Sequence, residues 1–213
     1  MAQSGALLTR LLATSVTAVS VAGKIIRDVM SKGEFNIVDK GVNDYQTEAD
    51  RSAQKCIITS LSKLFPDVTI IGEEEKSNCE VPSDWIVTDM DQEVLNVKLP
   101  SHLENVNPKD LCIWVDPLDG KCFIFIIFHQ LFQKNFFFFV GTSEYTQGLV
   151  EHVTVLVGVA VGNKAIGGVI HQPYFKNKSG SLGRTIWGIE GVGVGGFKPI
   201  LPPEGKRIIV TTR

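Results

Sequence analysis

The 213-residue sequence predicts a mixed α/β protein, with helices in its first half and a largely antiparallel sheet in its second half. Three observations predict this class. Large apolar residues recur at helical spacing between residues 7 and 30, and a second helical segment stops at Pro66. From residue 111 onward, β-branched runs alternate with glycine-rich turns, which is typical of paired strands.

The first helix is predicted to be amphipathic and capped by Ser4. A secretory signal is the alternative, since the segment is apolar and rich in small residues. It has no basic region at its start, however, and Arg10 interrupts the apolar run. These features favour a helix of the folded domain.

The second helix is predicted to run from Glu48 to Leu64, because Pro66 cannot continue it. A short strand, 68–71, follows and leads through a glycine into three glutamates. The acidic, proline-punctuated segment 77–110 is predicted to be surface structure with one short helix.

The later strands follow from β-branched runs. Residues 111–116 form a buried-type strand, and residues 152–175 form two strands joined by the turn Gly162-Asn163. Residues 181–200 continue as strand and glycine-rich turn, and residues 206–213 form a last strand.

The amino-acid composition limits the kinds of molecule that the protein is expected to bind and the compartment in which it is expected to lie. The formal charge of −2 gives no basic field, so we expect no nucleic-acid partner. The content of 44% apolar and 21% charged residues is typical of a globular protein. Four cysteines without regular spacing indicate reduced thiols, which predicts a cytoplasmic location.

A phenylalanine-rich run covers residues 121–141 and raises the question of a membrane segment. Its longest uncharged apolar stretch, Cys122–Phe128, has seven residues, whereas a spanning helix needs roughly twenty. Several polar side chains, among them Lys134, interrupt the run. We therefore expect no membrane partner.

Carboxylates gather where predicted elements begin or end. Asp50 lies at a helix start, Glu73 follows one strand through a glycine, and Asp116 and Asp119 follow another. Strands of one sheet can bring such groups to one point, and Mg²⁺ prefers several anionic or carbonyl oxygens. Each cluster alone has an ordinary explanation, such as a solvated turn or a helix-dipole contact. The combination predicts a magnesium site.

The segments "DYQTEAD", "IIGEEE" and "WVDPLDG…T" resemble three motifs of the lithium-sensitive, magnesium-dependent phosphatase superfamily that includes inositol monophosphatase. Within it, "FPDVTIIGEEE" and "LGRTIWG" are most similar to the 3'(2'),5'-bisphosphate nucleotidases. The resemblance implies the layered α-β-α-β-α sandwich of the inositol monophosphatase and fructose-bisphosphatase type, with metals between its lobes.

The resemblance also implies metal ligands. Glu73 and Asp116, with the Leu118 carbonyl oxygen, are expected to bind a first Mg²⁺, and Asp116 and Asp119 a second. Two to three Mg²⁺ ions are expected in all, and Li⁺ is expected to inhibit.

Catalysis and substrate binding are assigned by the same resemblance. Asp50 and Thr142 are expected to take a proton from the attacking water, and Thr212 matches a substrate-contacting position. The expected reaction removes the 3'-phosphate of adenosine 3',5'-bisphosphate, giving AMP, in a monomer whose partner is this small molecule. An inositol polyphosphate 1-phosphatase and a non-catalytic fragment are the alternatives.

The chain departs from the family pattern in two places. Residues 121–141 separate Gly120 from Thr142, which are adjacent in the family motif. Codons for both borders can carry splice signals, which predicts a translated intron; a hydrophobic docking loop is the alternative. Residues 1–213 are then expected to form the N-terminal, metal-binding lobe, without the family's C-terminal lobe. We expect such a chain to aggregate and to be nearly inactive.

Overall fold

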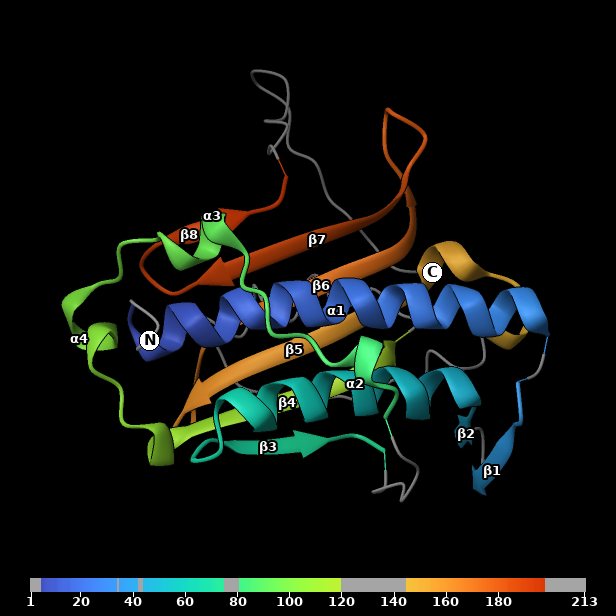
Figure 1. The fold of residues 1–213 in the computed structure, drawn as a ribbon, viewed down its shortest axis with the longest axis horizontal. Helices are drawn as coiled ribbons and strands as arrows, with labels where there is room; N and C mark the ends of the chain where they lie inside the picture. The colour runs from blue at the N-terminus through green and yellow to red at the C-terminus, as the bar shows by residue number, and fades with distance from the viewer. Residues whose placement is uncertain (1–4, 34, 42–43, 75–80, 120–144, 198–213) are drawn as a thin grey trace, which may run out of the picture.

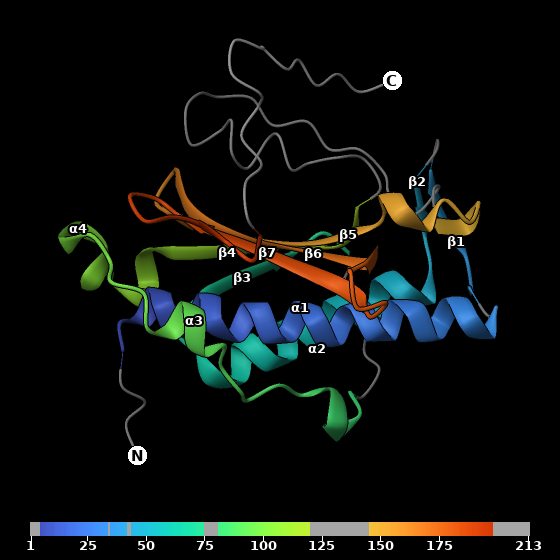
Figure 2. The same cartoon turned by 90° about the horizontal axis from the view of Figure 1, so that it is seen from above.

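The structure is a computed structural model and describes residues 5–33, 35–41, 44–74, 81–119 and 145–197. These residues form one six-stranded sheet, with two long helices, α1 and α2, on the same face of it (Figures 1 and 2). The strand order is β3 (Thr69–Gly72), β4 (Leu111–Asp119), β5 (Thr154–Val161), β6 (Lys164–Lys176), β7 (Leu182–Ile189) and β8 (Gly193–Gly195).

Helix α1 (Leu7–Lys32) begins later than predicted. Its N-cap is Ala6, and Ser4 lies outside the described residues. Gly5 has φ +119°, a conformation that no right-handed helix contains, so the helix cannot extend further back. It ends at Gly33, whose φ of 70° lets its N–H donate to the carbonyls of Val29 and Met30.

The apolar character of α1 is explained by its packing. The helix lies over β5, β6 and β7 and against α2. By length and composition alone it could cross a membrane, yet 72% of its most apolar stretch is buried in the fold. Its buried hydroxyls are satisfied within the helix: Thr14 donates to Arg10 O and Ser15 to Leu11 O, both at 2.9 Å. This is the packing of a core helix, as predicted.

Helix α2 (Glu48–Leu64) has the predicted bounds. Thr47 is the N-cap of a capping box, and Phe65 is the C-cap, directly before Pro66. The helix packs over β3 and β4.

A short antiparallel pair of strands precedes α2, in a stretch for which no structure was predicted. The strands are β1 (Val38–Gly41) and β2 (Asp44–Gln46), and they are too short to show a period-2 pattern in the sequence.

The sheet is largely antiparallel, as predicted. Only β3 and β4 run parallel among the described strands, and β5 and β6 form the predicted hairpin through Gly162-Asn163. Strand β3 begins and ends one residue later than expected, and residues 206–213 lie outside the described chain. Between β3 and β4, over the described residues 81–110, four one-turn helices replace the single predicted helix: η1 (Ser83–Trp85), α3 (Gln92–Leu95), α4 (Ser101–Glu104) and η2 (Pro108–Asp110). Another, η3 (Val150–His152), precedes β5.

One polar cluster lies between α1 and the sheet. His171 on β6 is 4% exposed, and its Nδ1 lies 2.8 Å from Thr185 Oγ1, which is 3.2 Å from Ser20 Oγ. The ring occupies the space beside Gly23, where a Cβ atom would lie 2.4 Å from Nε2. Burial, and then the positive charge of Arg27, lowers the pKa of His171 to about 4.

We predict that acid destabilises the fold through His171. Between pH 6.5 and about 4 the unfolded chain binds a proton that the folded chain does not, so the free energy of unfolding falls as the pH falls. The loss reaches about 3 kcal/mol at most. Urea denaturation at pH 7.0, 5.5 and 4.5 measures it.

His171→Gln should flatten this pH dependence, whereas His152→Gln, at an exposed histidine, should leave it unchanged. If the free energy of unfolding depends on pH equally in the two variants, groups other than His171 cause the acid sensitivity.

Candidate active site

The ends of β3 and β4 lie side by side because the two strands are parallel. Gly72 pairs with Val115, and the N–H of Glu73 donates to Val115 O at 3.0 Å, one residue past the end of β3. Parallel strands bring their carboxyl ends to the same edge of a sheet. Glu73 and Asp116, each the next residue after this pair, therefore meet there.

A β-bulge brings Asp116 and Asp119 to the same face of the sheet. Asp116 pairs with Leu156 and Asp119 pairs with Thr154, so β4 advances three residues where β5 advances two. In a regular strand, residues three apart point to opposite faces. The extra residue of the bulge removes this difference. The sequence "DPLD" thus presents both carboxylates together only because the strand is irregular.

The charge environment of Asp116 shows that the four predicted carboxylates are neighbours. Burial raises the pKa of Asp116 to about 7, the charge of Asp119 adds to the rise, and Asp50 contributes further. A hydrogen bond with the Glu73 side chain and one from the Leu118 N–H, 3.3 Å from Oδ1, oppose it. Residues far apart in the sequence are thus close enough to perturb one another.

Asp50 is positioned by the start of α2. It is 2% exposed, and its Oδ2 accepts the N–H of Thr47 at 2.8 Å and the Thr47 hydroxyl at 2.5 Å. The same hydroxyl oxygen accepts the N–H of Ala49 at 3.2 Å. The capping box therefore fixes both the first turn of the helix and the carboxylate that points from it.

The glutamates after β3 have different environments. Glu73 is exposed, whereas Glu74 is 6% exposed and its Oε2 accepts from Gln46 Nε2 at 2.5 Å. Gln54 makes two hydrogen bonds to the backbone of Glu74. Sequence reasoning missed Gln46 and Gln54, and it included Glu74 in the acidic cluster without separating it from Glu73. The available signal was the spacing of Gln54, four residues after Asp50 and so on the same face of α2.

Thr142 and Thr212 lie outside the described residues, so their predicted roles stay predictions. The chain is described again from Tyr145, which is fully buried and donates from its hydroxyl to Ile26 O at 2.7 Å. Burial, the charge of Tyr174 and that of Asp50 raise the pKa of Tyr145. The chain thus returns close to Asp50 three residues after Thr142.

The donor set suits a hard divalent cation. Carboxylates with one carbonyl oxygen are the ligands that Mg²⁺ uses, and a cation would relieve the mutual repulsion that raises the pKa of Asp116. Among residues 5–33, 35–41, 44–74, 81–119 and 145–197, however, no group of three His, Cys, Asp or Glu side chains is already arranged to hold a metal. The chemistry of the donor groups, rather than a ready-made cluster, is what fits the ion.

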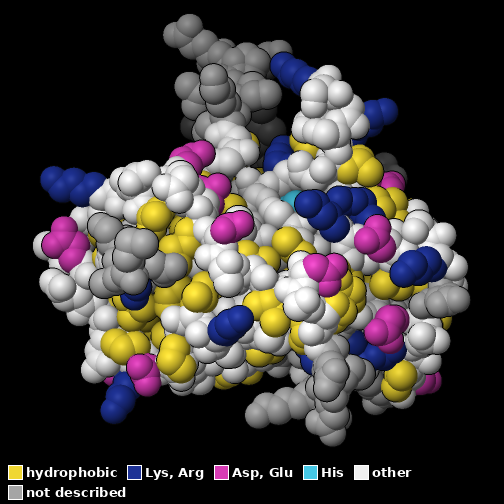
Figure 3. Space-filling model, in the orientation of Figure 1, with side chains coloured by type: hydrophobic (Ala, Val, Ile, Leu, Met, Phe, Trp, Pro, Cys, Tyr) yellow, Lys and Arg dark blue, Asp and Glu magenta, His cyan; other side chains and the backbone are white. Residues whose placement is uncertain are grey.

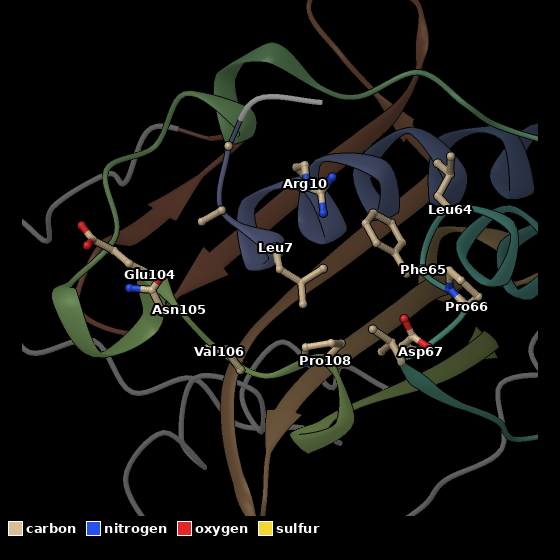
Figure 4. Close-up of a pocket in the computed structure, with 13 residues that line it drawn as sticks. Leu7, Arg10, Leu64, Phe65, Pro66, Asp67, Glu104, Asn105, Val106 and Pro108 are labelled. Atoms are coloured by element: carbon tan, nitrogen blue, oxygen red, sulfur yellow. The ribbon is translucent and has the colours of Figure 1, made fainter. Parts of the chain in front are cut away.

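A pocket of about 550 Å³ lies at the opposite end of α2 (Figure 4). It is lined by residues around the start of α1 and the end of α2, including Arg10, Phe65, Asp67 and Glu104, and by none of the predicted site residues. Acidic and basic side chains are interspersed on the face drawn in Figure 3. Neither feature identifies a second charged site.

Comparison with known proteins identifies the family. The profile of the inositol monophosphatase family matches residues 7–122, which is more than half of the sequence. The chain belongs to the inositol monophosphatase family. The match ends where the phenylalanine-rich run begins, and the nature of that run stays a prediction.

Relatives with curated names are similar over the whole chain. The human protein named 3'(2'),5'-bisphosphate nucleotidase 1 is 42% identical over 217 aligned positions, covering 100% of this chain and 64% of the relative. The Dictyostelium discoideum protein of the same name is 34% identical, covering 90% of this chain and 58% of its own length. The chain thus spans less than two thirds of these relatives.

Solved structures support the fold. The extragenic suppressor protein suhB from Bartonella henselae matches with a TM-score of 0.54 at 20% identity, covering 85% of this chain and 50% of the other. An IMPase from Thermotoga maritima matches with a TM-score of 0.51 at 20% identity, covering 92% and 52%. The predicted α/β fold class is confirmed, and the described residues form a six-stranded sheet with a helical layer on one face, beside the small β1–β2 sheet.

We predict that Thr47→Ala destabilises the protein by about 1–2 kcal/mol, because α2 loses its cap and Asp50 loses one of its donors. Thr47→Ser keeps the hydroxyl and should cost less than about 0.5 kcal/mol. Chemical denaturation measures both variants. Equal losses in Ala and Ser variants would show that the methyl group, not the hydroxyl, matters.

Proposed function

We propose that the protein is a Mg²⁺-dependent phosphomonoesterase, a 3'(2'),5'-bisphosphate nucleotidase that removes the 3'-phosphate of adenosine 3',5'-bisphosphate. The observation that carries this proposal is the meeting of Asp50, Glu73, Asp116 and Asp119 at one edge of the sheet. Family membership and the names of the most similar relatives support it. A cytoplasmic monomer is part of the proposal.

Each ligand has a proposed role. Glu73, Asp116 and the Leu118 carbonyl oxygen hold one Mg²⁺, and Asp116 and Asp119 hold a second, within a set of two to three ions. Bound Mg²⁺ supplies a water of lowered pKa and neutralises charge on the phosphoryl oxygens. The carboxylates bind and orient these ions, and Asp116 is shared because it lies between Glu73 and Asp119.

Asp50 is proposed to take the proton of the attacking water together with Thr142. Two hydrogen bonds from Thr47 keep the Asp50 carboxylate in one orientation, and α2 holds it at the edge of the cluster. Tyr145, where the described chain resumes, is close enough to Asp50 for the charge of that carboxylate to raise the pKa of Tyr145. Thr212 is proposed to contact the substrate.

The activity is proposed for the whole protein, because the chain spans 64% of the human relative. Phosphate release should be measured with adenosine 3',5'-bisphosphate and with inositol 1,4-bisphosphate. One sample is the 213-residue chain, and the other lacks residues 121–141 and carries the C-terminal third of the human relative. Faster release from the nucleotide by the second sample supports the proposal. Faster release from the inositol phosphate would favour the alternative substrate, and no release would favour a non-catalytic fragment.

We predict that Asp116→Asn lowers phosphate release by the active sample roughly 100-fold or more, because a shared ligand loses its charge. Asp110→Asn is the matched control, since Asp110 is exposed and lies directly before β4. Its activity should stay unchanged. Activity of Asp116→Asn within a few-fold of the parent would refute the metal assignment.

We predict that millimolar Li⁺ inhibits the active sample, as the family resemblance implies, whereas the same concentration of Na⁺ does not. Steady-state rates at several Mg²⁺ concentrations measure the effect. Insensitivity to Li⁺ would separate this protein from the lithium-sensitive group.

A further inference from the structure

Gln54 reaches from α2 to the turn that carries the glutamates. Its side chain is 6% exposed and makes two hydrogen bonds to one residue. Its Oε1 accepts the N–H of Glu74, and its Nε2 donates to the carbonyl of Glu74, both at 2.8 Å. One carboxamide thus satisfies both backbone groups of Glu74, as a neighbouring strand would.

Gly72 provides the space for this contact. A Cβ atom at residue 72 would lie 2.5 Å from the Cδ and Oε1 atoms of Gln54 and 2.7 Å from its Nε2. These distances are far below van der Waals contact, so any side chain at residue 72 would displace the carboxamide. The glycine is therefore required by the position of Gln54.

Glu73 lies between two fixed backbone groups. Its own N–H donates to Val115 O on the strand that carries Asp116, and the next residue is held by Gln54 from the helix that carries Asp50. The Glu73 side chain itself is exposed. Its direction therefore depends on the backbone beneath it as well as on its hydrogen bond with the Asp116 side chain.

We propose that Gln54 is a positioning residue: by holding the backbone of Glu74, it aims the Glu73 carboxylate at Asp116. This inference rests on the proposed function, in which Glu73 is a ligand of the cation. Residues that orient a ligand typically change metal affinity 10–100-fold when they are removed. A role in stability alone would leave the affinity of the folded chain unchanged.

The experiment uses the full 213-residue chain, freed of metal, in five forms: the parent, Gln54→Ala, Gly72→Ala, the double variant and Gln92→Ala. Gln92 is an exposed glutamine on α3 and serves as the matched control. Mn²⁺ titration followed by electron paramagnetic resonance gives affinity. Hydrogen exchange of the Glu74 amide, measured without metal, reports whether its hydrogen bond to Gln54 is intact.

We expect Gln54→Ala and Gly72→Ala each to weaken Mn²⁺ binding about tenfold and to speed exchange at Glu74, with Gln92→Ala unchanged. The double variant should bind Mn²⁺ no more weakly than Gln54→Ala, because the methyl group added at residue 72 then meets no carboxamide. Gly72→Ala keeps every polar group, so it tests the same contact should Gln54→Ala fail to fold.

Faster exchange at Glu74 with unchanged Mn²⁺ affinity would overturn the positioning role and leave the proposed function intact. Additive losses in the double variant would also overturn it, since the two residues would then act separately. Absence of Mn²⁺ binding by every form, including the parent, would overturn the proposed metal site and the inference with it.

Discussion

The hydrogen bond from the Glu73 N–H to the Val115 carbonyl joins the end of β3 to the strand that carries both aspartates. It continues the parallel pairing of these strands by one residue. A single-residue slip would turn Glu73 to the other face of the sheet and away from Asp116. The bulge that aligns Asp119, and the helix that supplies Asp50, add their carboxylates around this pair.

Helix α2 contributes residues both to the charged site and to the apolar core. Its first turn carries Asp50, its next turn carries Gln54, and its buried apolar face packs on β3 and β4. Packing therefore fixes the distance between the helix and the strand ends, while the capping box fixes the direction of the first carboxylate. The repulsion among these groups is tolerated because the rest of the domain holds the elements together.

Helices and strands were predictable where a local sequence signal determines where the element ends or turns. Helix α2 has its predicted bounds because Thr47 caps it and Pro66 stops it, and Gly162-Asn163 marks the hairpin. That these four carboxylates lie close together was predictable from their positions at element ends, whereas their role stays a prediction. The bulge between Asp116 and Asp119 was not, since it exists only through pairing with β5. The role of Gln54 likewise depends on a backbone twenty residues away.

The packing of α1 over β5, β6 and β7 has a consequence for how the chain folds. The first helix is complete at residue 32, whereas the strands that cover it end near residue 189. Helix α2 is made soon after α1, but at about 5–20 residues per second the strands that cover α1 are complete only roughly ten to thirty seconds later. Contacts of such high sequence separation form late and slowly. The face of α1 that packs on the sheet therefore stays exposed until these strands have been made.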